Sequence, residues 1–380
     1  MFKNRSFFRY LIIVGFFSFL SIFVVALINY KIDPTKVYSS YFKSSKNNDG
    51  ISLSDFIEKL VSSKNGVIMK DYIWNERDIH YSLAEYPTGA ECTIVGSSQV
   101  KQISSSRKNK SLVKTCNGIV NLGLNGGVLE DYLVMSQSII GNKNPPKNII
   151  FAISPWTLNF NRDSRWLHYK SKFADMLVKI TNNKENKVEI YNNSKSYKIA
   201  LFKNLINLKY FISSLNLLIS KKDLSIEMAE DFNYDIGAKN KVLLPDGSEI
   251  SSSEEIKKMH SHRIDGLSPL SNWGIVPGRW YDKNAIEIFI KLVSYLKKDF
   301  NIIFLMTPYH PEVWKIDDQP VVIAMKNVEL EVHEIAKFLN VDVIGSFDPK
   351  KAGCDANEFI NEIHAKDLCL SKLENVYTLN

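Results

Sequence analysis

Hydrophobic positions are distributed unevenly along the chain, and the densest group lies near the N-terminus. Residues 10–29 read YLIIVGFFSFLSIFVVALIN, twenty residues without a charge. A helix of this length can cross a bilayer. Lys3, Arg5 and Arg9 precede the run, which predicts a cytoplasmic N-terminus with the rest of the chain on the other side of the membrane.

A cleaved signal peptide is the alternative interpretation of this run. The run is long for the apolar region of a signal peptide, and no small-residue cleavage site of the A-x-A type follows it. We therefore expect residues 1–30 to be a cytoplasmic tip and a transmembrane anchor. The protein would then be single-pass in the cytoplasmic (inner) membrane, with a periplasmic or extracellular domain.

Beyond the anchor the pattern changes to short apolar runs that alternate with amphipathic stretches. A polar segment rich in Ser, Lys and Asn comes first, and an amphipathic helix is predicted over 53–64. We interpret residues 31–89 as a stalk or N-terminal extension. From residue 90 onward we expect strands at 93–95, 118–122, 148–154, 301–307 and 341–344, and helices at 129–140, 284–298 and 328–339.

Strands that alternate with helices predict an α/β domain with a parallel sheet flanked by helices. The run NIIFAIS at 148–154 is apolar at consecutive positions, as in a strand buried on both faces. Residues 165–280, approximately, are rich in Lys and Asn and lack this strand rhythm. We expect them to be a mainly helical insertion in an extracytoplasmic domain over 90–380.

Composition narrows the function classes. Of 380 residues 45% are hydrophobic and 23% charged, which is typical of a globular protein. The net charge of +7 is scattered along the chain, with no basic stripe and interleaved aromatics, so we expect no nucleic-acid partner. The charge is compatible with anionic envelope polymers or lipid headgroups. We expect no cofactor and no metal ion.

Four cysteines give an even count, which in an exported domain predicts disulfides with three alternative connectivities. Cys92 and Cys116 each come just before a predicted strand, and parallel neighbours would bring these strand starts together. Cys354 and Cys369 bracket the segment DANEFINEIHAKDL. The spacings favour two local pairs, Cys92–Cys116 and Cys354–Cys369. In a cytosolic domain four free thiols would be expected instead.

Polar, glycine-rich or histidine-bearing segments follow every predicted strand, at the edge where open α/β sheets bind their ligands. They are Gly96–Ser97–Ser98, the stretch 121–127, Ser154 to Asn159, Tyr309–His310, and Asn361 to His364. A single segment of this kind would be an ordinary turn. Five such segments together predict a site.

With these motifs in this order, the chain resembles the SGNH (GDSL-like) hydrolase superfamily over roughly residues 90–160 and 300–372. The matching motifs are Gly96-Ser97-Ser98, Asn121-x-Gly123-x-x-Gly126, Pro155-Trp156 and His364. The resemblance is to the membrane-anchored branch that includes proteins of teichoic acid D-alanyl transfer and alginate O-acetylation. It implies a flavodoxin-like parallel sheet.

The resemblance also implies roles for individual residues. Ser98 would be a nucleophile, with His364 as the base that takes its proton. The backbone N–H groups of Ser98 and Gly126 would bind an oxyanion, and either Ser154 or Asn159 would add a third donor. Further residues are expected to contact substrate or to support the site: Trp156, by packing or as a sugar platform, Tyr309 and His310.

Asn361 departs from the family pattern, in which an aspartate stands three residues before the histidine. An amide can orient the imidazole but cannot balance an imidazolium charge. Asp355, Glu358 or Glu362 would be the alternative sources of a carboxylate. Otherwise the site would work as a Ser–His pair, or would have kept binding without catalysis.

The function implied is serine O-acyltransfer, of an acetyl group to a cell-envelope polysaccharide, with a membrane-bound O-acyltransferase as the partner. An esterase or deacetylase acting on the same class of substrate is the second hypothesis. A catalytically weak or inactive polysaccharide-binding scaffold is the third, and Asn361 favours it.

Overall fold

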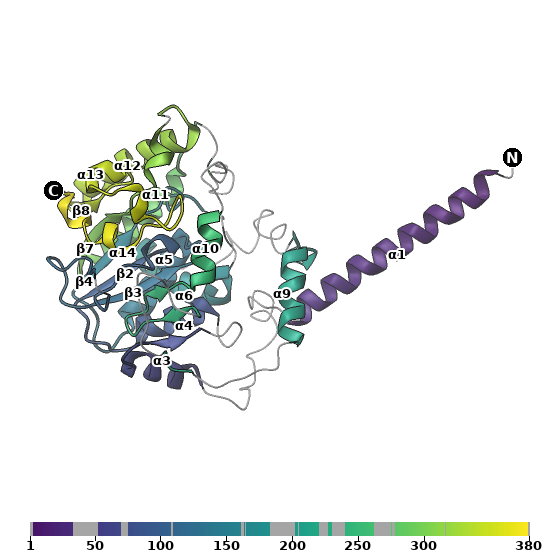
Figure 1. The fold of residues 1–380 in the computed structure, drawn as a ribbon, viewed down its shortest axis with the longest axis horizontal. Coiled ribbons are helices and arrows are strands. Elements are labelled where there is room, and N and C mark those ends of the chain that lie inside the picture. The colour runs from purple at the N-terminus through teal and green to yellow at the C-terminus, as the bar shows by residue number, and fades with distance from the viewer. Residues whose placement is uncertain are drawn as a thin grey trace. The chain divides into compact units, whose positions relative to one another are not determined.

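The computed structural model divides the chain into two compact units, coloured along the chain in Figure 1. One unit comprises Met1–Asn48 and Val188–Asp223, and the other comprises Asp49–Lys187 and Leu224–Asn380. The structure describes residues 3–32, 52–69, 75–107, 109–160, 163, 165–182, 202–203, 205–219, 227–229, 240–261, 275, 278–315 and 317–378.

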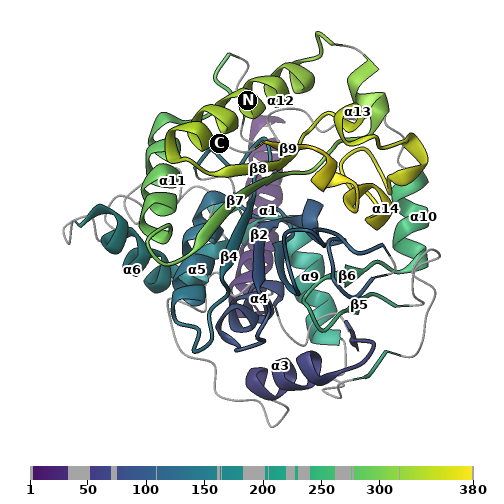
Figure 2. The same cartoon turned by 90° about the vertical axis from the view of Figure 1, so that its left-hand side faces the viewer.

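The larger unit is built on a six-stranded sheet, with the strand order β3-β2-β4-β7-β8-β9 (Figure 2). The first five strands are parallel and β9 is antiparallel to β8. Their bounds are β2 Cys92–Ser97, β3 Ile119–Leu124, β4 Asn148–Ala152, β7 Asn301–Met306, β8 Asp342–Gly345 and β9 Tyr377–Thr378. The predicted parallel α/β sheet is therefore confirmed.

Helices cover one side of this sheet. In Figure 2, α5 (Leu129–Ile140), α6 (Lys170–Thr181) and α11 (Lys283–Leu296) lie together beside the strands. The long helix α12 (Pro320–Leu339) precedes β8 and contacts it. The predicted helices at 129–140, 284–298 and 328–339 are all present, although α12 begins eight residues earlier than expected.

The other side is covered by the C-terminal segment. Strand residues such as Ile94, Ile150 and Ile303 share one buried cluster with Phe359 and Leu370. The short elements of this segment are α13 (Pro349–Ala352), η6 (Ala356–Glu358), α14 (Asp367–Leu370) and η7 (Leu373–Asn375). This burial presses the segment that carries His364 against the sheet.

Part of the segment interpreted as a stalk belongs to the globular unit. Helix α3 (Leu53–Ser62) buries Phe56, Ile57 and Leu60, and α4 (Glu76–Glu85) packs against β3 and α5. Residues 52–69 and 75–89 are thus an integral N-terminal extension. Residues 33–51 of the expected stalk, and 70–74, lie outside the described residues.

The insertion is not purely helical where the structure describes it. Besides α6, α9 (Leu208–Ile219) and α10 (Ser253–Ser261), it contains β5 (Val242–Leu243) and β6 (Glu249–Ile250). These strands form an antiparallel sheet with β1 (Val67–Ile68) from the extension. The turn around Asp246 joins β5 to β6, and the Asp246 carbonyl accepts the Asn121 N–H at 2.6 Å. The β5–β6 part of the insertion is therefore docked on the central sheet.

The smaller unit contains α1 (Lys3–Ile32) and α9. Within α1, the stretch Phe7–Ile32 is long and apolar enough to cross a membrane. A membrane anchor and a signal sequence both fit this helix.

Both predicted disulfides are present. Cys92 is bonded to Cys116 with a Cα–Cα distance of 5.7 Å, and Cys354 to Cys369 with one of 5.2 Å. Cys92 lies in register with Ile119 of β3, so the adjacent strand starts bring the first pair together as expected. Two disulfides fit a domain that folds in an oxidising compartment.

We predict that replacing both Cys354 and Cys369 with Ser lowers the free energy of unfolding by about 3 kcal/mol, because the disulfide closes a loop of 15 residues. Denaturant titration of the purified protein measures this loss. Limited proteolysis should also cut within 355–368 faster in this variant. The matched control replaces Cys92 and Cys116, which should lose comparable stability without new cleavage there. Unchanged unfolding of the first variant would contradict the prediction.

Candidate functional site

Ser98 stands where β2 passes into a short helical turn, η1 (Ser98–Val100). Glycines allow this tight passage. A Cβ on Gly96 would approach the Ala152 Cβ to 2.9 Å, and one on Gly123 would approach Val100 Cγ2 to 2.7 Å. The Ser97 side chain is buried, whereas Ser98 is only half-buried. Of the two serines, Ser98 is the one with access from solvent.

His364 contacts Ser98 directly. Its Nε2 lies 3.0 Å from the Ser98 Oγ, and its Nδ1 lies 3.0 Å from the Asn361 Oδ1. The two residues are 266 positions apart in the sequence, and the sheet and the C-terminal segment bring them together. The prediction that Ser98, His364 and Asn361 meet at the carboxyl edge of the sheet is confirmed.

The backbone determines the orientation of the Asn361 amide. Its Oδ1 accepts the N–H groups of Ile363 at 3.0 Å and His364 at 2.9 Å. An NH₂ group in this place would face two donors, so the oxygen must occupy it. The imidazole therefore donates its Nδ1–H to this oxygen, which leaves Nε2 free to accept the Ser98 hydroxyl proton. This is the tautomer that a general base needs.

Burial and the positive charge of Lys101 lower the pKa of His364 to about 4. The imidazole is consequently neutral at neutral pH. Neither cause is a carboxylate, in contrast to a triad in which an acid raises the histidine pKa.

The three acids considered as substitutes lie elsewhere. Asp355 is exposed, and Glu358 is paired with Lys372 at 2.6 Å. Burial lowers the pKa of His310, and the charge of Glu362 opposes this effect, so the Glu362 carboxylate acts on His310. Among the described residues, the His364 ring is hydrogen-bonded only to Ser98 and Asn361. The site is therefore built with an amide in the third position.

Ser154 is not hydrogen-bonded to the Ser98 side chain. Its hydroxyl lies 2.9 Å from the Ser97 Oγ and donates to Gln99 Oε1 at 2.7 Å. Gln99 in turn donates to the Ile363 carbonyl at 3.4 Å. Sequence reasoning missed Gln99, a buried residue that links the ends of β2 and β4 to the His364 loop.

One backbone donor near the site is unoccupied. Within the described part of the chain, the Gly126 N–H has no hydrogen-bond acceptor, whereas the pairing of Ser97 with Leu124 continues the β2–β3 ladder up to the Ser98 N–H. Gly126 has a φ of +61°, which a glycine adopts without strain. The next residue packs closely on the serine turn, because a Cβ on Gly127 would lie 2.7 Å from the Gly96 carbonyl oxygen. The loops that carry Ser98 and Gly126 are therefore in contact.

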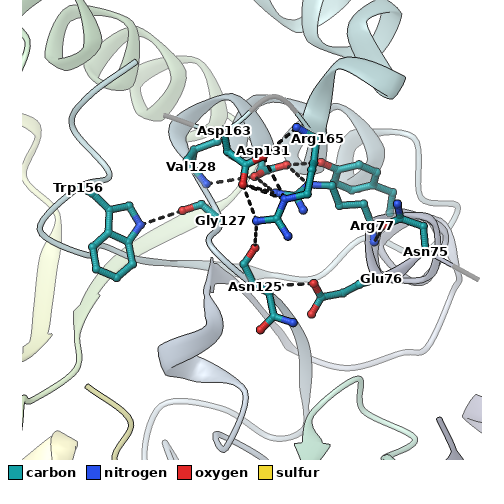
Figure 3. A network of polar contacts seen from close by, with 11 residues as sticks. Asn75, Glu76, Arg77, Asn125, Gly127, Val128, Asp131, Trp156, Asp163 and Arg165 are labelled. Carbon is teal, nitrogen blue, oxygen red and sulfur yellow. Dashed lines mark hydrogen bonds and ion pairs between the residues drawn. The ribbon is translucent and has the colours of Figure 1, made fainter. Parts of the chain in front are cut away.

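The remaining predicted residues support loops. Trp156 is 3% exposed and donates its indole N–H to the Gly127 carbonyl at 3.0 Å, so it packs and does not offer a sugar platform (Figure 3). Asn159 donates to the Trp280 carbonyl at 3.3 Å. Ser154 and Asn159, the two alternative donors that the resemblance implies, thus each donate a hydrogen bond within the protein.

Tyr309 and His310 hold the loop after β7. Tyr309 is fully buried, with its ring 6.0 Å from that of Phe347. The His310 Nδ1 accepts the Glu312 N–H at 3.1 Å, and burial lowers the pKa of this histidine. Since His310 also donates its backbone N–H to Glu362, it braces the segment that precedes His364.

Two groups of described side chains have the spacing of metal ligands. Cys354, Glu358 and Cys369 form one, but its sulfurs are joined in the disulfide. Glu76, His80 and Glu249 form the other. There the ammonium of Lys101 binds both carboxylates and supplies the positive charge. Neither group as built needs an ion.

Comparison of the chain with models of protein families, and with curated proteins, gave no match.

We predict that Ser98 reacts with a fluorophosphonate with a rate that rises through about pH 4 and is level at neutral pH, because His364 is a neutral base above its lowered pKa. In Asn361→Asp a carboxylate would accept the same N–H groups and stabilise the imidazolium, so the midpoint should move up and the neutral-pH rate should increase.

This increase should stay well below the roughly 10⁴-fold cost of the reverse change in serine proteases, because Asn361 already holds the correct tautomer. Asn361→Ala is the control and should lower the rate. A wild-type midpoint near 6.5, or no shift in Asn361→Asp, would contradict the proposed role of Asn361.

Proposed function

We propose that this protein is a membrane-anchored, extracytoplasmic serine O-acyltransferase of the SGNH type. The observation that carries the proposal is the hydrogen-bonded chain from Ser98 through His364 to the backbone-oriented Asn361. A serine hydroxyl bound to a neutral imidazole in the tautomer of a general base, beside the unoccupied N–H of Gly126, is the arrangement that acyl transfer requires.

The mechanism has two halves. In the first, His364 Nε2 takes the Ser98 proton while Oγ attacks the carbonyl carbon of the donor ester. The N–H of Gly126 stabilises the oxyanion, and His364 returns the proton to the leaving oxygen. In the second, His364 takes the proton of an acceptor hydroxyl, which attacks the acyl-serine and releases Ser98 with its proton restored.

The N-terminal helix and the disulfides support the proposed location. The basic residues before α1 favour an N-terminus on the cytoplasmic side, and the disulfides favour a domain on the oxidising side. The substrate proposed is a cell-envelope polysaccharide that receives an acetyl group. A membrane-bound O-acyltransferase would deliver the acyl group across the bilayer.

Two further functions have support. The same site chemistry with water as the acceptor gives an esterase or deacetylase. A binding scaffold is favoured by one observation, that no described carboxylate contacts the His364 ring.

Ser98→Ala should abolish formation of a covalent acyl-enzyme and polysaccharide acylation in cells, because Oγ is the only atom of Ser98 that can take the acyl group. Mass spectrometry of the trapped protein, and of the polymer at matched expression, measures both. Ser97→Ala is the matched control, since its buried hydroxyl contacts Ser154 instead of His364. Unaltered acylation in the Ser98 variant would discard the enzymatic function and leave the scaffold.

A further inference from the structure

The loop between β3 and α5 is held by side chains from several distant elements (Figure 3). The Asn125 N–H donates to Glu76 Oε2 at 3.0 Å, and the Asn125 carbonyl accepts from Arg165 Nη2 at 2.6 Å. Trp156 binds the Gly127 carbonyl, and the Val128 N–H donates to Asp131 at 3.1 Å. Almost every peptide unit of this loop is thus bound from at least one side.

The bond from Arg165 has a particular consequence for Gly126. The Asn125 carbonyl and the Gly126 N–H belong to one planar peptide unit, and in a trans peptide they point in opposite directions. All described peptide bonds are trans. An acceptor bond at the Asn125 oxygen therefore fixes the direction of the Gly126 N–H. It does so without using up that donor, which has no acceptor among the described residues.

Arg165 is itself fixed. Its Nε donates to Asp163 Oδ2 at 2.8 Å, and Asp163 lies 3.9 Å from the buried guanidinium of Arg77. Arg77 makes a bidentate pair with Asp131 at 2.8 Å for each bond, and both side chains are 1% exposed. Paired arginine and carboxylate groups of this kind have a rigid geometry. The loop is consequently attached to a rigid network of charges.

We propose that Arg165 is a positioning residue that sets the Gly126 N–H as an oxyanion donor, an inference that rests on the proposed function. Arg165 lies outside the segments that resemble the hydrolase superfamily. It acts on the reaction through the Asn125 peptide and does not touch the reacting atoms. A loop without this bond keeps Ser98 and His364 in place but lets the donor rotate.

Arg165→Gln tests this role through the rate of fluorophosphonate labelling of Ser98 across pH. The rate should fall about 10- to 100-fold, since losing an oxyanion donor costs 10²–10³ and misplacing it costs less. The pH midpoint should not move, because His364 is unaffected. Arg165→Lys, which retains a donor, should recover part of the rate. Lys291→Gln is the matched control, since it removes a cation from the exposed pair with Glu287.

The outcomes separate the two proposals. Labelling of Arg165→Gln within twofold of the control, with a reactive wild type, would overturn the role of Arg165. A shifted pH midpoint would also overturn it, because the effect would then act on the base. If Arg165→Gln melts at a lower temperature than the control, the labelling rate of Arg165→Lys decides. Partial recovery of the rate supports the role of Arg165, and no recovery overturns it. A wild type that does not react at all would instead refute the proposed function.

A separate observation concerns the smaller unit, where α9 is docked on the last turn of α1. The Asn29 side chain donates to the Leu205 carbonyl at 2.8 Å and accepts from the Ser214 hydroxyl at 3.1 Å. Four large apolar side chains beside this contact are 43–67% exposed: Phe202, Ile206, Leu208 and Ile212. The apolar stretch of α1 has 26 residues, about 39 Å of helix against a hydrocarbon core of about 30 Å. Asn29 then falls near the membrane boundary.

We infer that α9, together with Phe202 and Ile206 just before it, lies in the interface of the outer leaflet, with these four apolar side chains among the lipid chains. A helix at this depth buries its apolar face in the boundary between headgroups and acyl chains. The inference requires that α1 is a retained membrane anchor, and it identifies the bilayer as the occupant of this surface. The contact of α9 with the bilayer would be a second membrane attachment besides α1.

Fluorescent labels on single added cysteines test this in the full-length protein in liposomes, since both native pairs are disulfide-bonded. A label on Ile212→Cys should be quenched more by lipids with a shallow nitroxide than by those with a deep one. A label on Phe19→Cys in α1 should be quenched most by the deep one, and the control Lys291→Cys by neither. An unquenched label at 212 with a quenched label at 19 overturns the inference. Labels unquenched at both positions overturn the anchor itself.

Discussion

Three donors converge on the side-chain oxygen of Asn361, namely two backbone N–H groups and the Nδ1–H of His364. The first two select the amide orientation, and the orientation selects the imidazole tautomer. The tautomer then determines whether Nε2 can accept a proton from Ser98. An amide placed without such backbone bonds could equally present its NH₂ group and give the wrong tautomer. The backbone thus performs here the orienting part of an aspartate's role, while the charge-balancing part is missing.

The parallel sheet makes this contact between distant residues feasible. Glycines at 96, 123 and 127 let the loops after β2 and β3 approach to distances at which a Cβ would overlap its neighbours. The C-terminal segment reaches the same edge because its apolar side chains pack on β2, β4 and β7. Buried polar groups such as Ser154 and Gln99 bind each other there, so the surroundings of Ser98 and His364 are satisfied internally.

Features that depend on local patterns were predictable from the sequence. The five parallel strands, the helix over 129–140 and both disulfides follow from apolar runs and cysteine spacing. The meeting of Ser98 with His364 followed from the order of motifs on the strands. In contrast, β1, β5 and β6 have two residues each, too few for a recognisable alternation. Glu76, Gln99 and Arg165 carry no local signal, since their partners are remote in sequence and are defined only by the folded backbone.

The Cys354–Cys369 disulfide determines in which compartment the contact between Asn361 and His364 is held in place. It closes the segment that holds both Asn361 and His364, so the oriented amide is tied to a covalent bond that forms in an oxidising compartment. A copy retained among cytosolic reductants would carry the same residues on a longer, unconstrained loop, where the chain entropy of the open form competes with the amide geometry. Oxidation thereby becomes a step in forming the contact between Asn361 and His364, and a newly made chain would acquire this geometry only in an oxidising compartment.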